Sequence, residues 1–221
     1  MSNRYGNCEL IDSPVVNHTL RSESDVIDDI INNIQPDGVF YDIGACHGSY
    51  ACIVASEYPD CDVHAFEPHP ASMYRVSQNM DMNDTIFNTH LMAIGGHVGD
   101  VKLDCGSGPA VHRLSNDPSG DTIPVQQSTL DSFVSLHAFP TVIKIDVEGA
   151  ECDVVQGGIE TLSDDRLTHV YIEIHYDDSG HSPMSNYGGT EQKIFDILYD
   201  AGFSVQKMNE RPATYHIKAT R

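Results

Sequence analysis

Short apolar runs alternate along this chain with segments whose apolar residues recur at helical spacing, and this alternation limits the possible folds more than any other feature. Buried strands are predicted for the apolar runs at residues 38–44, 61–68, 85–96, 141–149 and 168–176. Strands that alternate with helices form a parallel sheet covered by helices on both faces. The sequence therefore predicts an α/β fold of three layers, in which ligands bind beyond the carboxyl ends of the strands.

Helices are expected before and between these strands, at residues 22–35, 49–58, 70–82, 129–137, 150–162 and 190–201. The last two apolar segments, FSVQKM and TYHIKA, flank the turn sequence NERPA and predict an antiparallel hairpin. Residues 95–127 are rich in Gly, Ser, Asp and Pro and predict a hairpin or an irregular insertion. We therefore expect residues 1–37 to form a helical cover and residues 38–221 to form one domain that contains this insertion.

The chain is strongly acidic: its 221 residues include 33 Asp and Glu but only 12 Lys and Arg, for a formal net charge of −21. Repulsion among so many like charges destabilises a compact fold at low ionic strength and is screened in concentrated salt. We favour a halophilic, salt-adapted protein over an ordinary acidic one, because the acids are spread along the whole chain. Unassisted binding to nucleic acid or to an anionic membrane is not expected, since both require basic patches.

The cysteines and the apolar segments argue against several other classes of protein. The six cysteines are scattered without a CxxC pair, which argues against a disulfide scaffold and a zinc site. No segment approaches the roughly 18 apolar residues of a membrane span. The opening sequence MSNRYGNCELIDSPVVNHTL lacks the basic stretch and the apolar core of a signal peptide, so we expect a cytoplasmic protein.

The end of the first predicted strand carries the pattern D-x-G-x-x-x-G, formed by Asp42, Gly44 and Gly48. Glycines allow the backbone to approach a ligand closely. A carboxylate beside the turn would repel a pyrophosphate and would favour a cationic ligand, such as an ammonium group beside the sulfonium of S-adenosylmethionine. On this motif alone, a tight turn whose Asp caps the next helix is an equally good interpretation.

The end of the second predicted strand carries another acid, Glu67, followed by Pro68. Nucleotide-binding α/β folds place an acid at this point, where it accepts hydrogen bonds from ribose hydroxyls. The alternative is an acid that is simply exposed to water. Because acids end both strands in the expected order, the sequence favours an adenosyl ligand.

Four segments together, FYDIGACHGSY, AFEPHP, IKIDVEGAE and VYIEIH, resemble the FkbM-type branch of the S-adenosylmethionine-dependent methyltransferases. The resemblance covers about residues 38–176. It implies a Rossmann-like fold with a mostly parallel, seven-stranded sheet whose last strand is antiparallel, and it implies methyl transfer, usually to oxygen. The family usually has Asn at the position of Cys46 in this chain, so contacts from that side chain are not carried over.

The resemblance also implies a set of cofactor contacts along the carboxyl ends of the first three strands. The first turn would contact the amino-acid part of the cofactor, the second strand end the ribose, and the third the adenine. The predicted cofactor residues are Asp42, Gly44, Ala45 and Gly48 in the first turn, Glu67 and Pro68 after the second strand, and Ala93 and Ile94 after the third.

Candidate catalytic residues follow from the chemistry of methyl transfer to a hydroxyl group, which needs a proton acceptor or a metal ion that acidifies the hydroxyl. Lys144 and Asp146 share a face of the fourth predicted strand, and Glu148 follows them. Glu173 and His175 share a face of the fifth and are expected to converge with Asp146. We favour an acid–histidine general base. Asp146, Glu173 and His175 could instead hold a divalent metal, although no metal is predicted.

Other polar residues are weaker candidates. Glu151 is as well explained by its place at a helix N-terminus as by a function. Exposure to water is the expected state of His169, His181 and His216. Contacts with a cofactor or an acceptor are conceivable but not predicted for His47, His112, Arg113 and Tyr187.

These observations predict an S-adenosylmethionine-dependent O-methyltransferase that acts on a small polar acceptor, such as a sugar or a glycan precursor. A nicotinamide-dependent oxidoreductase is one alternative, but the G-x-G-x-x-G pattern is missing and Asp42 stands beside the turn. A non-catalytic binding module on the same fold is the other alternative. The sequence makes no prediction of the oligomeric state.

Overall fold

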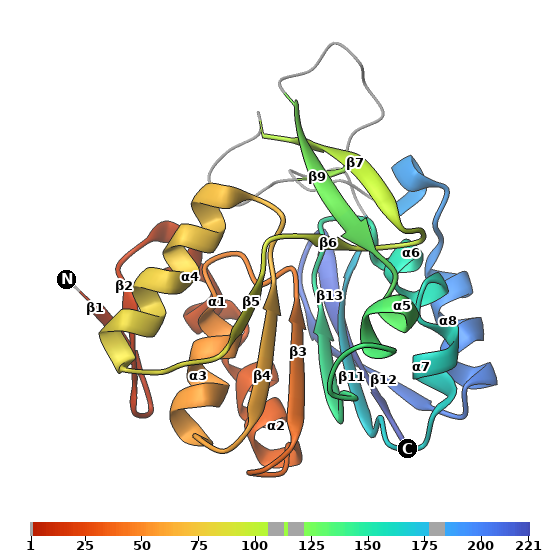
Figure 1. Ribbon diagram of the computed structural model, residues 1–221. Coiled ribbons are helices and arrows are strands. Elements are labelled where there is room, and N and C mark those ends of the chain that lie inside the picture. Colours follow the sequence, from red (N-terminus) through yellow and green to blue (C-terminus); the bar gives the residue numbers. More distant parts are fainter. Residues whose placement is uncertain (1, 106–112, 115–121, 177–183) are drawn as a thin grey trace.

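A seven-stranded sheet forms the centre of the protein in a computed structural model, which describes residues 2–105, 113–114, 122–176 and 184–221 (Figure 1). The strands lie in the order β12-β13-β11-β10-β3-β4-β5. Their bounds are Val39–Ile43 (β3), Asp62–Phe66 (β4), Asn88–His90 (β5), Val142–Ile145 (β10), His169–His175 (β11), Ser204–Glu210 (β12) and Thr214–Thr220 (β13). Within this sheet β13 alone runs opposite to the other six strands, which are parallel to one another. The predicted fold class is confirmed.

Helices cover both faces of this sheet and make it the middle of three layers (Figure 1). One hydrophobic cluster lies under α2, α3 and α4, and the other under α5 to α8. Successive side chains of a strand point to opposite faces of the sheet and so pack in different clusters. Tyr171 of β11 packs in the first cluster, while Val170 and Ile172 pack in the second. The bounds are Ser49–Glu57 (α3), Pro70–Asn83 (α4), Leu130–Val134 (α5), Glu151–Gln156 (α6), Ile159–Ser163 (α7) and Glu191–Asp200 (α8). Among the described residues, no helix is long and apolar enough to span a bilayer.

The N-terminal segment differs from the single helix expected at residues 22–35. It contains a hairpin of β1 (Ser2–Tyr5) and β2 (Cys8–Ile11), and then two helices, α1 (Pro14–Ser22) and α2 (Ser24–Asn33). Asn79 and Asn83 of α4 accept hydrogen bonds from backbone amides of β2, so the hairpin is fastened to the helix layer by distant polar contacts. Such long-range contacts leave no periodic pattern in the local sequence.

The predicted insertion forms a second, four-stranded sheet in its described part. Its strands are β6 (Ala93–Ile94), β7 (Gly99–Asp104), β8 (Arg113–Leu114) and β9 (Thr122–Ser128). The apolar run at 85–96 was expected to be one strand, but it divides: β5 ends at His90, and β6 pairs with β9.

The helix expected at 150–162 also divides, into α6 and α7, at Gly157 and Gly158. A Cβ atom on Gly157 would lie 2.2 Å from the carbonyl oxygen of Gly95, so the backbones meet too closely for any other residue. At the break between α6 and α7, the backbone therefore packs directly against the residue that follows β6 of the second sheet. The short 3-10 helix Met184–Tyr187 lies in the loop that precedes α8.

The net charge of −21 predicts a stability that depends on salt. We expect the Tm to rise by roughly 5 °C when KCl is raised from about 0.1 M to 2 M, because salt screens repulsion between surface carboxylates. Sorbitol at matched osmolality is the control, because it is excluded from the protein surface but does not screen charge. An equal rise in sorbitol, or no rise in KCl, would contradict the salt-adapted interpretation.

Candidate active site

A cavity of about 370 Å³ opens at the carboxyl ends of β3, β4, β10 and β11. Its walls come from α1, from the turns that follow β3, β4 and β10, and from β6 and β7 of the second sheet. Its volume lies within the range of small-molecule sites. The cavity therefore lies where parallel α/β sheets bind ligands, at the strand ends that carry the acidic motifs.

The glycine turn after β3 forms one wall of the cavity, through Gly44, Ala45 and Cys46. Gly44 has φ +83°, and a Cβ atom there would lie 1.7 Å from the carbonyl oxygen of Asp146. The amides of Gly44 and Ala45 both donate to the carbonyl of Phe66 at the end of β4. Cys46 has φ +50°, a conformation that Asn adopts more readily than most residues. The turn thus demands glycine at Gly44 and tolerates cysteine two residues later.

Asp42 lies behind this wall and not in it. Its side chain is 1% exposed, and its Oδ2 accepts a hydrogen bond from the amide of Ala51 (3.2 Å) in the first turn of α3. Its Oδ1 lies 4.0 Å from Nζ of Lys144. Burial raises the pKa of Asp42 to about 6, although Lys144 and the Ala51 amide oppose the shift. The helix amide therefore holds the carboxylate outside the cavity lining, and the predicted contact of Asp42 with a cofactor stays a prediction.

Glu67 lines the cavity and connects the turns that follow β3 and β4. Its Oε2 accepts from the amide of Cys46 (2.9 Å), and its Oε1 accepts from the amide of His69 (2.7 Å). Each oxygen keeps a second lone pair for a ligand hydroxyl. Burial raises the pKa of Glu67 to about 8 against the effect of the two amides. Pro68, Ala93 and Ile94 line the same end of the cavity.

The raised pKa of Glu67 predicts how stability depends on pH. Between its ordinary pKa and about 8 the folded chain holds a proton that the unfolded chain releases, so the stability of the ligand-free protein falls as pH rises through this window. The Glu67→Gln variant cannot release this proton. We expect its Tm to fall by about 4 °C less than that of the parent between pH 5 and 8.5, measured by differential scanning calorimetry. Parallel curves for the two proteins would contradict the assignment.

Lys144 and Asp146 form an ion pair on the cavity wall (Nζ–Oδ2 3.0 Å). Burial alone would lower the pKa of Lys144, but Asp146 and Asp42 outweigh it and raise it. Burial would raise the pKa of Asp146, but Lys144 and His175 hold it well below its ordinary range. The ammonium group also lies 4.6 Å from the ring centre of Tyr50. Asp146 is therefore a permanent anion and a poor proton acceptor.

His175 is buried among four carboxylates and does not line the cavity. Its Nδ1 lies 2.8 Å from Oε1 of Glu151, and its Nε2 lies 3.7–3.9 Å from oxygens of Asp146, Glu148 and Glu173. Burial would lower the pKa of His175, but Glu151 and the other carboxylates raise it to about 10. The strand-end residues do lie together. Because both ring nitrogens lie beside carboxylates, the protonated form of the imidazole is favoured, which counts against the general base that the sequence predicted.

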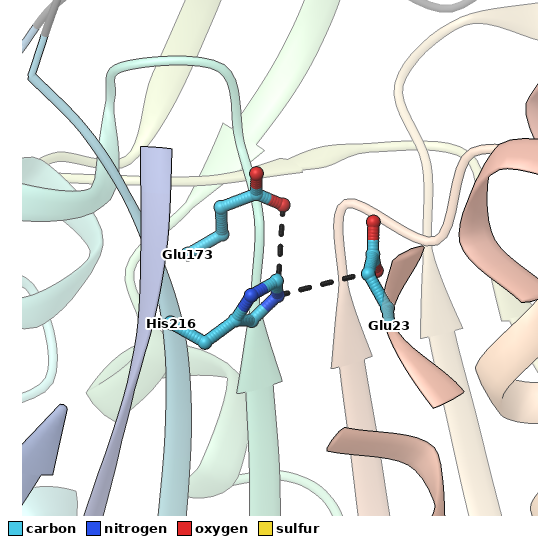
Figure 2. Close-up of side chains that lie close together, drawn as sticks. All are labelled: Glu23, Glu173 and His216. Carbon is cyan, nitrogen blue, oxygen red and sulfur yellow. Dashed lines mark ion pairs between the residues drawn. The ribbon is translucent and has the colours of Figure 1, made fainter. Parts of the chain in front are cut away.

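A second group of buried ionisable side chains, which come from three different elements, lies close together (Figure 2). Glu173 of β11 and Glu23, from the junction of α1 and α2, both face His216 of β13. Arg211, in the turn between β12 and β13, donates to Oε1 of both glutamates. Burial and the charge of Asp146 raise the pKa of Glu173 to about 7, while burial lowers that of His216 to about 4. Glu23, Glu173 and Arg211 line the cavity.

The turns and strand ends that build this site match a known protein domain. A profile described as the methyltransferase FkbM domain matches residues 42–205, most of the chain. The chain belongs to the FkbM methyltransferase family.

Two curated relatives and one solved structure illustrate what this family member is similar to. The hexuronic acid methyltransferase AglP of Haloferax volcanii is 28% identical over 71% of the chain. The 2-O-methyltransferase NoeI of Sinorhizobium fredii is 30% identical over 63% of it. In both cases the match spans 64% of the relative's own length. The magnesium protoporphyrin IX methyltransferase ChlM of Synechocystis, solved with bound SAM, shares the fold with a TM-score of 0.55 at 12% identity, covering 96% of this chain and 86% of that one.

Several other residues lie elsewhere than the sequence indicated. His216 was expected to be exposed, but it is fully buried, because β13 inserts between β11 and β12. Glu151 is buried and accepts a hydrogen bond from the amide of Gly149. His47 lines the cavity, whereas Tyr187 does not. His112 and His181 lie outside the described residues, and only the backbone of Arg113, in β8, is described.

The site of this FkbM family member includes residues that sequence reasoning missed. Glu23 and Arg211 reach the cavity from opposite ends of the chain, and His18 and Thr19 of α1 add to the same wall. One signal could have found Arg211. A strand parallel to β11 must end at the carboxyl edge of the sheet, so the turn NERPA that follows it also lies there. No comparable signal marked Glu23.

Proposed function

We propose that this protein transfers the methyl group of S-adenosylmethionine to a hydroxyl oxygen of a sugar. One observation carries the proposal: a single cavity is lined both by the glycine turn and Glu67 and by the carboxylates of Asp146, Glu148 and Glu173 at the carboxyl ends of β10 and β11. The first group suits an adenosyl cofactor and is called the cofactor end, and the second suits a hydroxylated acceptor and is called the acceptor end. Membership of the FkbM family and the similarity to AglP, a hexuronic acid methyltransferase, and NoeI, a 2-O-methyltransferase, support both halves.

The cofactor end provides the contacts that an adenosyl sulfonium compound needs. Glu67 offers carboxylate oxygens to the ribose hydroxyls, and Ala93, Ile94 and Leu103 offer apolar surface to the adenine. In this proposal Asp146, whose pKa is held low by Lys144, contributes a carboxylate to the cavity wall that would attract the positive sulfur. The cofactor supplies the reactive methyl group, and the protein supplies orientation and charge.

The acceptor end offers hydrogen-bonding groups and a route for the proton that the hydroxyl loses. Glu148 and Glu173 line the cavity beside Asp146, and neither contacts the Lys144 ammonium in the described ion pairs. In our proposal a carboxylate at this end accepts the proton while the oxygen attacks the methyl carbon. His175 holds the acids in place and does not take part in the proton transfer.

Binding experiments separate this proposal from its rivals. S-adenosylhomocysteine is expected to raise the Tm of the protein, whereas NAD is not; the reverse result would favour an oxidoreductase. Methyl-labelled S-adenosylmethionine is then incubated with hexuronic acids, nucleotide sugars and glycan extracts, and the products are identified by mass spectrometry. A label on a sugar oxygen supports the proposal. A protein that binds the cofactor but labels none of these acceptors supports a binding module instead.

Substitutions at the acceptor end test the assigned roles. Glu148→Gln and Glu173→Gln keep the size of the side chain but cannot accept a proton. We expect kcat to fall by about 100-fold or more in at least one of these variants, because a positioned base contributes about 10²–10⁴-fold. The dissociation constant for S-adenosylhomocysteine should stay within about threefold, as measured by calorimetry. Full activity in both variants would refute proton transfer to these carboxylates.

A further inference from the structure

Three side chains from distant parts of the chain converge on one point beside the acceptor end of the cavity (Figure 2). Nε2 of His216 lies 3.6 Å from Oε2 of Glu173 and 4.0 Å from Oε2 of Glu23. All three side chains are buried, and each residue is held by a different element: the α1–α2 junction, β11 and β13. Two carboxylate oxygens and one imidazole nitrogen thus face one another across a gap that is too wide for hydrogen bonds.

The state of His216 is the independent observation that points to a ligand. The residue is 0% exposed, and within the described part of the chain neither ring nitrogen has a hydrogen-bond partner. Buried polar groups without partners are rare, and each such group calls for an explanation. Because its Nε2 is aimed between two carboxylate oxygens, the missing partner is a group that all three atoms can bind at once.

Arg211 binds only one oxygen of each of the two carboxylates, Glu23 and Glu173. Its two terminal nitrogens donate to Oε1 of Glu23 and Oε1 of Glu173. The hydroxyl of Tyr50 donates to Oε2 of Glu23 (2.8 Å), which leaves that oxygen one further lone pair. The Oε2 atoms on the side of His216 therefore keep the capacity to bind a cation, while Arg211 holds both side chains in orientation.

We propose that Glu23, Glu173 and His216 bind a divalent first-row transition-metal ion. Carboxylate oxygens suit Mn²⁺, and imidazole suits Zn²⁺ and its neighbours in the row, so a mixed set of this kind selects this class over Ca²⁺ or Mg²⁺. Neighbouring ligand atoms on such an ion stand about 3.0–3.5 Å apart. The imidazole nitrogen, now 3.6 and 4.0 Å from the two carboxylate oxygens, needs to approach each by about 1 Å or less, and the ligand atoms of all three residues already lie within 4.8 Å of one another.

The position of the ion beside the cavity gives it a chemical use, which rests on the proposed function. Glu23 and Glu173 both line the cavity, so the open coordination positions would face it. An acceptor hydroxyl bound there would be acidified and held in place. With Glu173 on the ion, Glu148 remains the cavity-lining carboxylate for the released proton.

A second set of possible ligands, Asp146, Glu148 and His175, lies nearby and provides a matched control. Its members already have strong partners: Lys144 contacts Asp146 at 3.0 Å, and Glu151 contacts Nδ1 of His175 at 2.8 Å. His216 has no such contact within the described residues. We therefore place the ion at the first set and expect Glu148→Gln to leave metal affinity unchanged.

Metal titration of the full chain, without a histidine tag, tests the proposal. After removal of metals with EDTA, Mn²⁺ binding is followed by electron paramagnetic resonance of the free ion, and Zn²⁺ binding by calorimetry. We expect one ion per chain in the parent protein. Glu23→Gln and His216→Gln should each weaken binding at least tenfold, and Glu148→Gln should not change it by more than about twofold.

Circular dichroism and the metal-free Tm of each variant show whether it is folded, and only folded variants are compared. Failure of the parent to bind Mn²⁺ or Zn²⁺ at millimolar concentration would overturn the proposal. So would a loss of binding in Glu148→Gln that is absent in His216→Gln, since the ion would then lie in the second set. Binding of S-adenosylhomocysteine is measured in the same samples. If the parent binds this nucleoside but no metal, the ion site alone is overturned. If it binds metal but not the nucleoside, the proposed function alone is overturned.

Discussion

Gly44→Ala is expected to abolish S-adenosylmethionine binding and to destabilise the protein by about 2–5 kcal/mol. The added Cβ atom would lie 1.7 Å from the carbonyl oxygen of Asp146, and φ at this residue is +83°. The turn can relieve that overlap only by moving away from β10, which carries Asp146 at its end. The cavity wall formed by the turn would then separate from the end of β10. The proposed positions of the cofactor and of the methyl acceptor would both be lost. Thermal unfolding and calorimetry with S-adenosylhomocysteine measure the two effects.

Gly96→Ala is the matched control for this substitution. A Cβ atom at Gly96 meets nothing closer than 3.6 Å, and its backbone does not require glycine. We expect its Tm and its affinity for the cofactor product to remain close to those of the parent. If Gly44→Ala behaved like this control, the close approach of the turn to Asp146 would not be a requirement of the fold.

Lys144→Met is expected to lower stability by about 3–5 kcal/mol, or the Tm by roughly 10 °C. Lys144 is 3% exposed and is the cation between Asp42 and Asp146. Methionine fills similar space but leaves the buried carboxylate of Asp42 without a counter-charge. The loss should shrink as pH falls from 8 to 5, since Asp42 can then take up a proton and become neutral.

A double variant isolates the electrostatic part of this effect. Asp42→Asn combined with Lys144→Met removes the buried anion together with its partner, and replacing both members of a buried pair is often tolerated. We expect the double variant to be more stable than Lys144→Met alone at pH 8. Strictly additive losses, with no change between pH 5 and 8, would mean that Lys144 acts through packing and not through its charge.

The strands of the central sheet were predictable because their signals are local. Each of β3, β4, β10 and β11 is a short apolar run, and nearly every residue in it is buried because helices cover both faces of the sheet. The N-terminal hairpin and the second sheet were harder to predict. Their strands are held by distant partners, such as Asn79 and Asn83 for β2, which no local pattern reveals.

The positions of the site residues that lie at strand ends were predictable from the sequence. The protonation state of a residue that is buried among charged neighbours was not. Asp146, Glu148, Glu173 and His175 were placed correctly at one edge of the sheet. The raised pKa of His175 was not predictable, because it depends on Glu151 of α6, a helix that follows a different strand. Sequence spacing shows which residues can meet, but the charge of each depends on every neighbour packed against it.

The origin of the cavity residues bears on how substrate choice could change within the family. The matched profile spans residues 42–205 and includes the glycine turn and Glu67, whereas Glu23, Arg211 and His216 all lie outside it. The proposed acceptor end thus combines Glu148 and Glu173, which lie inside the profile, with Glu23 and Arg211, which lie outside it. If the proposed function holds, exchanging the two chain ends between homologues would test whether Glu23 and Arg211 contribute to the choice of acceptor.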